Sequence, residues 1–114
     1  MKKENTVLKA LRNKVTIAGR VIEEIFFDLK HIQYGWDQEK RDYKDGPARN
    51  NYTEDDIVDL FEQLNTLVQV PVEQKAKKKS VEHRFIFYIY DGDKRLKMVV
   101  DLMKNEATVV VTIH

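Results

Sequence analysis

Apolar residues recur every three or four positions between about Asn5 and Lys30. The positions in this stripe are Val7, Leu8, Leu11, Val15, Ala18, Ile22, Ile25, Phe26 and Leu29. Such spacing places side chains on one face of an α-helix and predicts an amphipathic helix. Gly19 and the β-branched run at residues 15–17 weaken a helix locally, so the segment also fits two consecutive helices, with Gly35 as a stop signal.

A second amphipathic helix is predicted to begin after Thr53. Thr53 is a favourable N-cap, and Asp56 three positions later completes a capping box in which Asp replaces the usual Glu. The acidic first turn suits the positive end of the helix dipole, so we do not interpret it as a metal site. The apolar stripe of this helix comprises Ile57, Leu60, Phe61, Leu64 and Leu67. Pro71 ends the helical pattern, and Val68–Val72 fits a short edge strand.

The last third of the chain alternates apolar and polar residues, which predicts a β-meander. The expected strands are Glu82–Tyr90, Lys94–Leu102 and Ala107–His114. Hairpin turns are expected at Asp91-Gly92-Asp93 and near Lys104-Asn105-Glu106. We therefore expect an α+β fold in which N-terminal helices pack on one face of a C-terminal antiparallel sheet of three to four strands. One domain is expected to span residues 1–114.

Because side chains alternate along a strand, the expected sheet has an apolar face and a second face, here called the mixed face. The apolar face would consist of Phe85, Phe87, Ile89, Leu96, Met98, Val100, Leu102, Val109, Val111 and Ile113. The helices would meet it through Ile22, Ile25, Phe26, Leu60, Phe61 and Leu64. The mixed face would carry Arg84, Ile86, Tyr88, Tyr90, Arg95, Lys97, Val99, Asp101, Thr108, Val110, Thr112 and His114. Its cations and aromatic rings suit single-stranded RNA, although an ordinary solvated sheet face has a similar composition.

Composition narrows the class of protein. The 114 residues are 42% hydrophobic, enough for one folded core, and the absence of Cys excludes disulfides and thiolate metal sites. No apolar run is long enough to span a membrane and the N-terminus lacks an apolar signal region, so we expect a cytoplasmic protein. The net charge of +1 does not by itself predict a nucleic-acid partner. One short run of the chain is nevertheless strongly basic, and it fits either a phosphate-binding surface or a solvated loop. This run contains Lys75, Lys77, Lys78 and Lys79.

The usual motifs of metal, nucleotide and covalent chemistry are missing from the sequence. The three His residues are far apart, only four Gly are present, and no Gly-x-Ser-x-Gly motif occurs. We therefore expect no metal site and no cofactor. An RNase that uses the 2′-hydroxyl of its substrate as the nucleophile needs only a base, an acid and a cation. On the mixed face, His114 could act as acid or base while Arg84 and Lys97 hold the phosphate.

Several short motifs lie in the same order as in a known group of proteins. The positions concerned are His31, Arg41, Arg49, Asp55-Asp56-Ile57, Pro71, Arg84 and Val111-Thr112-Ile113-His114. Together they resemble the barnase–EndoU–colicin–RelE group of small nucleases, in its phage- and toxin-associated branches. The resemblance covers roughly residues 31–114 and implies RNase activity, with helices followed by a meandering antiparallel sheet.

The leading prediction is a small metal-independent endoribonuclease of the toxin type. Its catalytic set is predicted to be His114, Arg84, Lys97, His31 and Arg41, with the last two closing over the mixed face. Its RNA-binding set is predicted to be Lys75, Lys77, Lys78, Lys79, Tyr88, Tyr90, Arg95 and Thr112. The expected partners are RNA and a cognate antitoxin or other protein. The alternative is a non-catalytic protein-binding module, such as an immunity protein, an antitoxin or a small phage regulator, which the near-neutral charge and acidic helix also suit.

Overall fold

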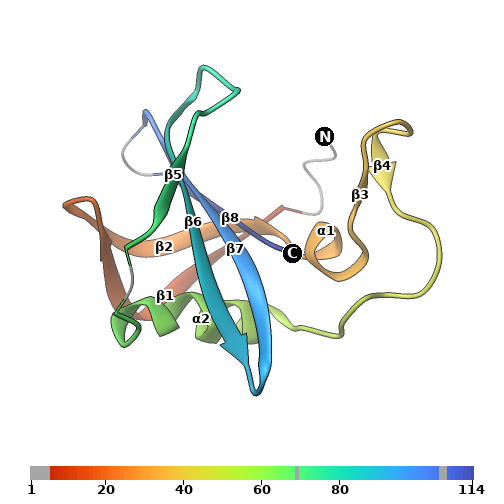
Figure 1. Cartoon of the computed structure of the whole chain (residues 1–114), viewed down its shortest axis with the longest axis horizontal. Helices are drawn as coiled ribbons and strands as arrows, with labels where there is room; N and C mark the ends of the chain where they lie inside the picture. Colours follow the sequence, from red (N-terminus) through yellow and green to blue (C-terminus); the bar gives the residue numbers. More distant parts are fainter. Residues whose placement is uncertain (1–5, 69, 106–107) are drawn as a thin grey trace.

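The N-terminal part of the chain folds into strands (Figure 1). The computed structural model describes residues 6–68, 70–105 and 108–114. In chain order the elements are β1 (Thr6–Ile17), β2 (Arg20–Asp28), α1 (Leu29–Tyr34), β3 (Trp36–Asp37), β4 (Asp42–Tyr43), α2 (Glu54–Glu62), the 3₁₀-helix η2 (Gln63–Asn65), β5 (Val72–Gln74), β6 (Val81–Asp91), β7 (Lys94–Met103) and β8 (Val109–Ile113). The described fold is mostly β, and the expectation of N-terminal helices is wrong.

One mixed sheet holds six of the strands, in the order β1-β2-β8-β7-β6-β5. Neighbouring strands are antiparallel except β2 and β8, which run parallel with Phe26 opposite Val110. The short strands β3 and β4 pair with each other in a separate ribbon. The expectation of a purely antiparallel C-terminal sheet of three to four strands is therefore wrong in size and in connectivity.

The β1–β2 hairpin turns at Ala18 and Gly19, whose φ angles are 52° and 78°. Positive φ at two successive residues is typical of the type I′ turn, which matches the twist of a two-residue hairpin. Glycine adopts this conformation without a steric penalty. The β-branched run at residues 15–17, which weakens a helix, stabilises a strand. Local sequence preferences at the turn and in β1 therefore agree with the hairpin.

An irregularity in the β1–β2 ladder explains the helix-like spacing of apolar residues. The register shifts between Ala10 and Val15 of β1. The fully buried residues of β2 are consequently Ile22, Ile25 and Phe27. Ile22 and Ile25 are three positions apart, which resembles the spacing of a helical stripe. Ile25 and Phe27 are two positions apart, which is the period of a strand. Phe26, which we expected in the core, is only partly buried and lies opposite Val110 on the mixed face.

Helix α2 covers the apolar face of the sheet. The Thr53 hydroxyl accepts a hydrogen bond from the Asp56 backbone N–H, and the Asp56 carboxylate accepts one from the Thr53 N–H. The predicted capping box is therefore confirmed. The residues that α2 contributes to the main core are Ile57, Leu60 and Phe61, while Leu64 and Leu67 pack against it from partly buried positions. On its solvent side, α2 forms ion pairs with Lys9 and Arg12 of β1.

The C-terminal meander has the predicted register. Strands β6, β7 and β8 pair in sequence order and antiparallel, and β6 and β7 are joined at the predicted Asp91–Asp93 turn. All ten residues predicted for the apolar face are buried, with no more than 8% of any of them exposed. The predicted alternation of faces along these strands is confirmed, except that Ile86 and Val99 of the mixed face are buried as well.

Some strands begin or end at other residues than expected. The edge strand lies at residues 72–74 instead of 68–72, and β8 begins at Val109. Asn5, Gln69, Glu106 and Ala107, which bound or fall within expected elements, lie outside the described residues. In the part of the chain that the structure describes, no helix has the length and apolar character needed to cross a membrane.

Candidate active site

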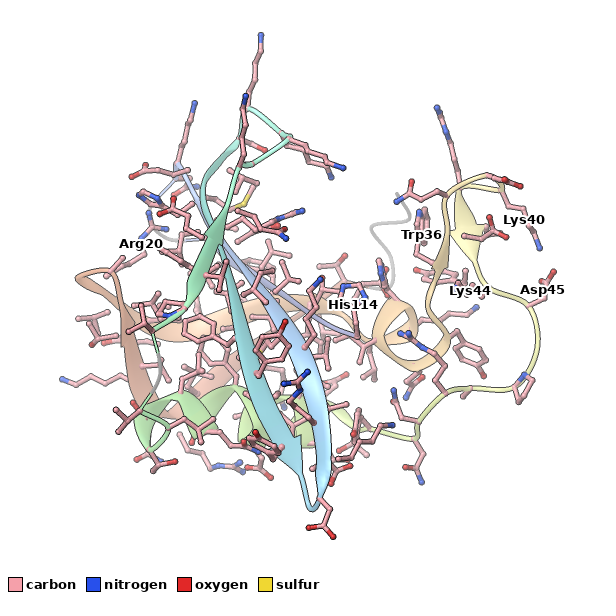
Figure 2. The ribbon with its side chains drawn as sticks, viewed as in Figure 1. Arg20, Trp36, Lys40, Lys44, Asp45 and His114 are labelled. Carbon is pink, nitrogen blue, oxygen red and sulfur yellow. The ribbon has the colours of Figure 1, made fainter. Side chains whose placement is uncertain are left out.

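Two histidines far apart in sequence come together beside the sheet. His31 lies on α1, which contacts β8, and His114 directly follows β8. Their ring centroids are 6.4 Å apart, and the ring planes are nearly perpendicular at 81°. Figure 2 places His114 next to α1, at the junction between the sheet and the 29–53 segment. We call His31 and His114 the histidine pair.

The backbone of α1 fixes the position of His31. The Asp28 carboxylate caps the helix by accepting a hydrogen bond from the His31 N–H at 3.0 Å, and its other oxygen accepts one from the Tyr43 hydroxyl at 2.7 Å. Gly35 ends the helix with φ 87°, and its N–H donates to the His31 carbonyl at 2.8 Å. A Cβ at Gly35 would lie only 3.2 Å from the Arg49 side chain, so both its φ and its surroundings favour glycine.

An aromatic cluster supports the ring of His31. Trp36 of β3 stacks on His31 with a centroid distance of 5.6 Å and an interplanar angle of 14°. Tyr43 of β4, opposite Trp36 in the ribbon, meets the indole edge-to-face at 5.5 Å. The Lys30 ammonium lies 4.9 Å from the centre of the Tyr43 ring. The indole therefore covers one side of the His31 imidazole.

His114 is anchored by β7. Its N–H donates to the Lys97 carbonyl at 2.8 Å, and the Lys97 N–H donates to the His114 carbonyl at 3.3 Å. Directly opposed residues of antiparallel strands project to the same face, so Lys97 lies beside His114 on the mixed face. Lys97 is in turn opposite Tyr88 of β6. Thr112 precedes His114 by one pleat on the same face. Strand parity therefore correctly predicted that Lys97, Thr112 and His114 share a surface.

Arg84 shares the mixed face but lies at a different level. It is opposite Asp101, four residues along β7 from Lys97, which is about 13 Å along the strand. Its guanidinium donates to both Asp101 carboxylate oxygens, at 2.7 and 2.8 Å. This ion pair occupies one edge of the guanidinium. Arg84 was predicted to hold the phosphate beside His114. The structure places Arg84 farther along the sheet, although its charge still lowers the pKa of His114.

The remaining predicted site residues surround the pair at greater distance. Arg41 lies in the β3–β4 turn with φ 53°, at the end of the ribbon away from Trp36. Tyr88 and Tyr90 are exposed on β6, and Arg95 lies over the Tyr88 ring at 4.5 Å. The exposed lysines 75 and 77–79 occupy the β5–β6 connection. In Figure 1 this connection and the β3–β4 ribbon rise on the same side of the molecule, with the C-terminal end between them.

Burial and positive charge act together on the histidine pair. Partial burial lowers the pKa of His31; the charge of Asp28 opposes this effect, and the charge of Arg49 adds to it. Partial burial also lowers the pKa of His114, and the charges of His31 and Lys97 lower it further. Both imidazoles are therefore mostly neutral at pH 7, in a setting that would attract an anion. Arg49 also donates hydrogen bonds to carbonyls at the end of α1.

His31 is half-buried and His114 is exposed. Two shallow depressions of ≈ 430 and ≈ 510 Å³ occur between α1, the start of α2 and β1, and neither is lined by a residue of the pair. A small molecule is usually enclosed by its pocket, so acid–base groups that lie outside these depressions suit a polymeric substrate better. No group of three or more His, Cys, Asp or Glu side chains in the described ranges could hold a metal ion.

Sequence reasoning overlooked three contributors to this site. These are Asp28, Trp36 and Tyr43. Asp28 lies three positions before His31, which is the spacing of an N-cap and its partner, so a correct helix start would have revealed it.

Comparison of the chain with protein-family models, with curated proteins and with solved structures gives no match. The chemistry of the histidine pair is therefore the basis for inferring function.

Proposed function

We propose that the protein is a metal-independent endoribonuclease of the toxin type, acting through the histidine pair. The observation that carries this proposal is the contact between His31 and His114 beside Lys97. Two imidazoles with pKa values near or below neutrality can exchange protons with one substrate, and a neighbouring ammonium can stabilise negative charge. The pair needs no metal ion or cofactor for this chemistry.

The proposed reaction is an internal transesterification. One imidazole, as its neutral form, removes the proton from a ribose 2′-hydroxyl while the 2′-oxygen attacks the adjacent phosphorus. The other, as imidazolium, donates a proton to the departing 5′-oxygen as the P–O5′ bond breaks. The products are a 2′,3′-cyclic phosphate and a 5′-hydroxyl. Lys97 stabilises the charge that develops on the pentacovalent phosphate.

The mixed face and the lysine connection would guide the RNA strand. Tyr88, Arg95 and Thr112 project from the same side of the sheet as His114, and Lys75 and Lys77–Lys79 would add phosphate contacts. Arg84 would contribute long-range attraction, since Asp101 already occupies part of its guanidinium. Arg41, at the tip of the β3–β4 ribbon, would contact RNA beyond the scissile phosphate.

Membership of the barnase–EndoU–colicin–RelE group is part of this proposal. The N-terminal helices that the structure replaces with strands were expected before residue 31, outside the region that carries the resemblance. Within residues 31–114 the chain has a helix that begins at the Asp55-Asp56-Ile57 motif and then the predicted meander.

A protein-binding role without catalysis is the second candidate. It is favoured by apolar side chains exposed in β1, in β2 and near β5: Leu8, Val21, Val70 and Val72. Exposed apolar residues near sheet edges are typical of protein contacts. In the RNase proposal, the same residues would contact a cognate antitoxin or other protein.

A cleavage assay with purified protein tests the proposed activity. Incubation with a short single-stranded RNA in EDTA should give fragments that end in 2′,3′-cyclic phosphate. Replacing a single ribose at the cleaved linkage by deoxyribose should abolish cleavage there, because the nucleophile is removed. RNA that stays intact with and without ribosomes would favour the protein-binding role.

The pH dependence of cleavage follows from the lowered pKa values. Catalysis requires one neutral and one protonated imidazole, and both pKa values lie below the ordinary value of about 6.5. Protonation is lost as the pH rises, so kcat/KM should be maximal below about pH 6.5 and should fall about tenfold per pH unit above the upper apparent pKa. Steady-state rates between about pH 5 and 8 measure this. A maximum near pH 9 would instead identify a lysine as the acid.

A further inference from the structure

We infer that Trp36 is a base-binding platform next to the reacting phosphate, so that the substrate is RNA with an unpaired nucleotide at the cleavage site. This inference rests on the proposed RNase function and deepens it, because it specifies the class of RNA and the side chain that recognises it.

The platform lies one ring away from the chemistry. The indole stacks on His31 at 5.6 Å, and His31 meets His114 edge-on at 6.4 Å. A phosphate held by the histidine pair would therefore have its neighbouring base within reach of Trp36. Figure 2 shows Trp36 above α1 and His114 beside the same helix, toward the sheet.

The indole is held firmly and is still accessible. Trp36 is partly exposed, whereas its neighbour Tyr43 is only 7% exposed. Tyr43 is fixed by its hydroxyl bond to Asp28 and lies under the Lys30 ammonium. A platform fixed by buried neighbours loses little conformational entropy when a base packs on it, which favours binding.

The chemistry of stacking points to single strands. Every base has a π-face, so an indole binds bases with little regard to sequence. In an RNA duplex the bases are stacked on each other and paired, and an aromatic side chain cannot reach their faces. Trp36 would therefore discriminate between unpaired and paired RNA, while Lys30 and Lys97 supply phosphate attraction common to both.

Trp36 is the only tryptophan in the chain, so its fluorescence reports on the platform directly. The probe is a short single-stranded oligonucleotide with 2′-O-methyl groups throughout, which cannot be cleaved because it lacks the nucleophile. Titration at fixed pH should quench Trp36 fluorescence. The same oligonucleotide annealed to its complement should bind at least about tenfold more weakly, and an abasic oligomer of equal length should cause no quenching. Equal quenching by duplex or abasic probe, or no quenching by the single strand, would overturn the inference.

Variants provide a second measurement. Trp36→Leu should weaken binding of a dye-labelled form of the same single strand about tenfold, whereas Trp36→Phe, which keeps an aromatic face, should lose much less. Equal losses in both variants would contradict stacking. If Trp36→Leu does not fold, the wild-type titration still decides. If the single strand quenches Trp36 fluorescence but RNA is not cleaved, the base platform is supported and the RNase proposal is rejected. If RNA is cleaved but no quenching occurs, the RNase proposal is supported and the base platform is rejected.

Discussion

Replacing His31 or His114 with Ala is expected to reduce kcat/KM for RNA cleavage in EDTA by about 100-fold or more. Each substitution removes one of the two groups that we propose transfer protons in the transition state, and such groups typically contribute about 10²- to 10⁴-fold. The double variant should be little worse than either single variant, because the two rings act on the same step. Initial rates on one RNA, with circular dichroism to verify folding, provide the measurement.

His83 supplies a matched control. Its Nδ1 lies 2.7 Å from a Glu73 oxygen, and its ring stacks on Phe85. It projects from β6 two strands away from His114, outside the histidine pair. His83→Ala should therefore keep nearly full activity. An equal loss in His83→Ala, or activity retained when His31 is removed, would contradict the proposed site.

Phe27→Ala is expected to lower the free energy of unfolding by about 3–5 kcal/mol, since this side chain is completely buried. Phe26→Ala should cost clearly less, because Phe26 is only partly buried on the other face of the sheet. Urea unfolding of the two variants measures the difference. The β1–β2 hairpin predicts the larger loss of stability for Phe27→Ala. An N-terminal helix would predict the larger loss for Phe26→Ala, because its apolar stripe includes Phe26 and excludes Phe27. A larger loss for Phe26→Ala would contradict the register of β2.

The sequence was sufficient to predict the elements whose signals are local. The alternation in residues 81–113, the Asp91–Asp93 turn and the Thr53 capping box each depend on neighbouring residues alone. The cap spacing is undisturbed, and the two-residue period runs regularly from His83 through β6 and along β7 and β8, so the structure agrees with the prediction there.

The N-terminal hairpin was mistaken for a helix because its ladder is irregular. The shift between Ala10 and Val15 brings Ile22 and Ile25, three positions apart, into the core. Gly19 and the β-branched run before it are two signals that contradict the helical periodicity. Together these two signals indicate a hairpin with a type I′ turn more specifically than the spacing of apolar residues indicates a helix.

Only part of the candidate site could be predicted from the sequence. Strand parity placed Lys97 and His114 together, because parity needs no knowledge of other elements. The contact of His31 with His114 depends on β2 lying beside β8, and nothing in the pattern of either strand specifies that pairing. The ion pair between Arg84 and Asp101 follows from the register of the β6–β7 hairpin, but the predicted site did not include it.

The parallel pairing of β2 and β8 also has a kinetic consequence. It joins Phe26 to Val110, 84 positions away in the chain, whereas the β1–β2 and β6–β7 hairpins close over two residues each. Long-range pairings close large loops and form slowly, after local hairpins. Because His31 follows β2 and His114 follows β8 closely, the two rings meet only when that last pairing forms. A refolding chain would therefore acquire most of its strands before it assembles the histidine pair that we propose cuts RNA.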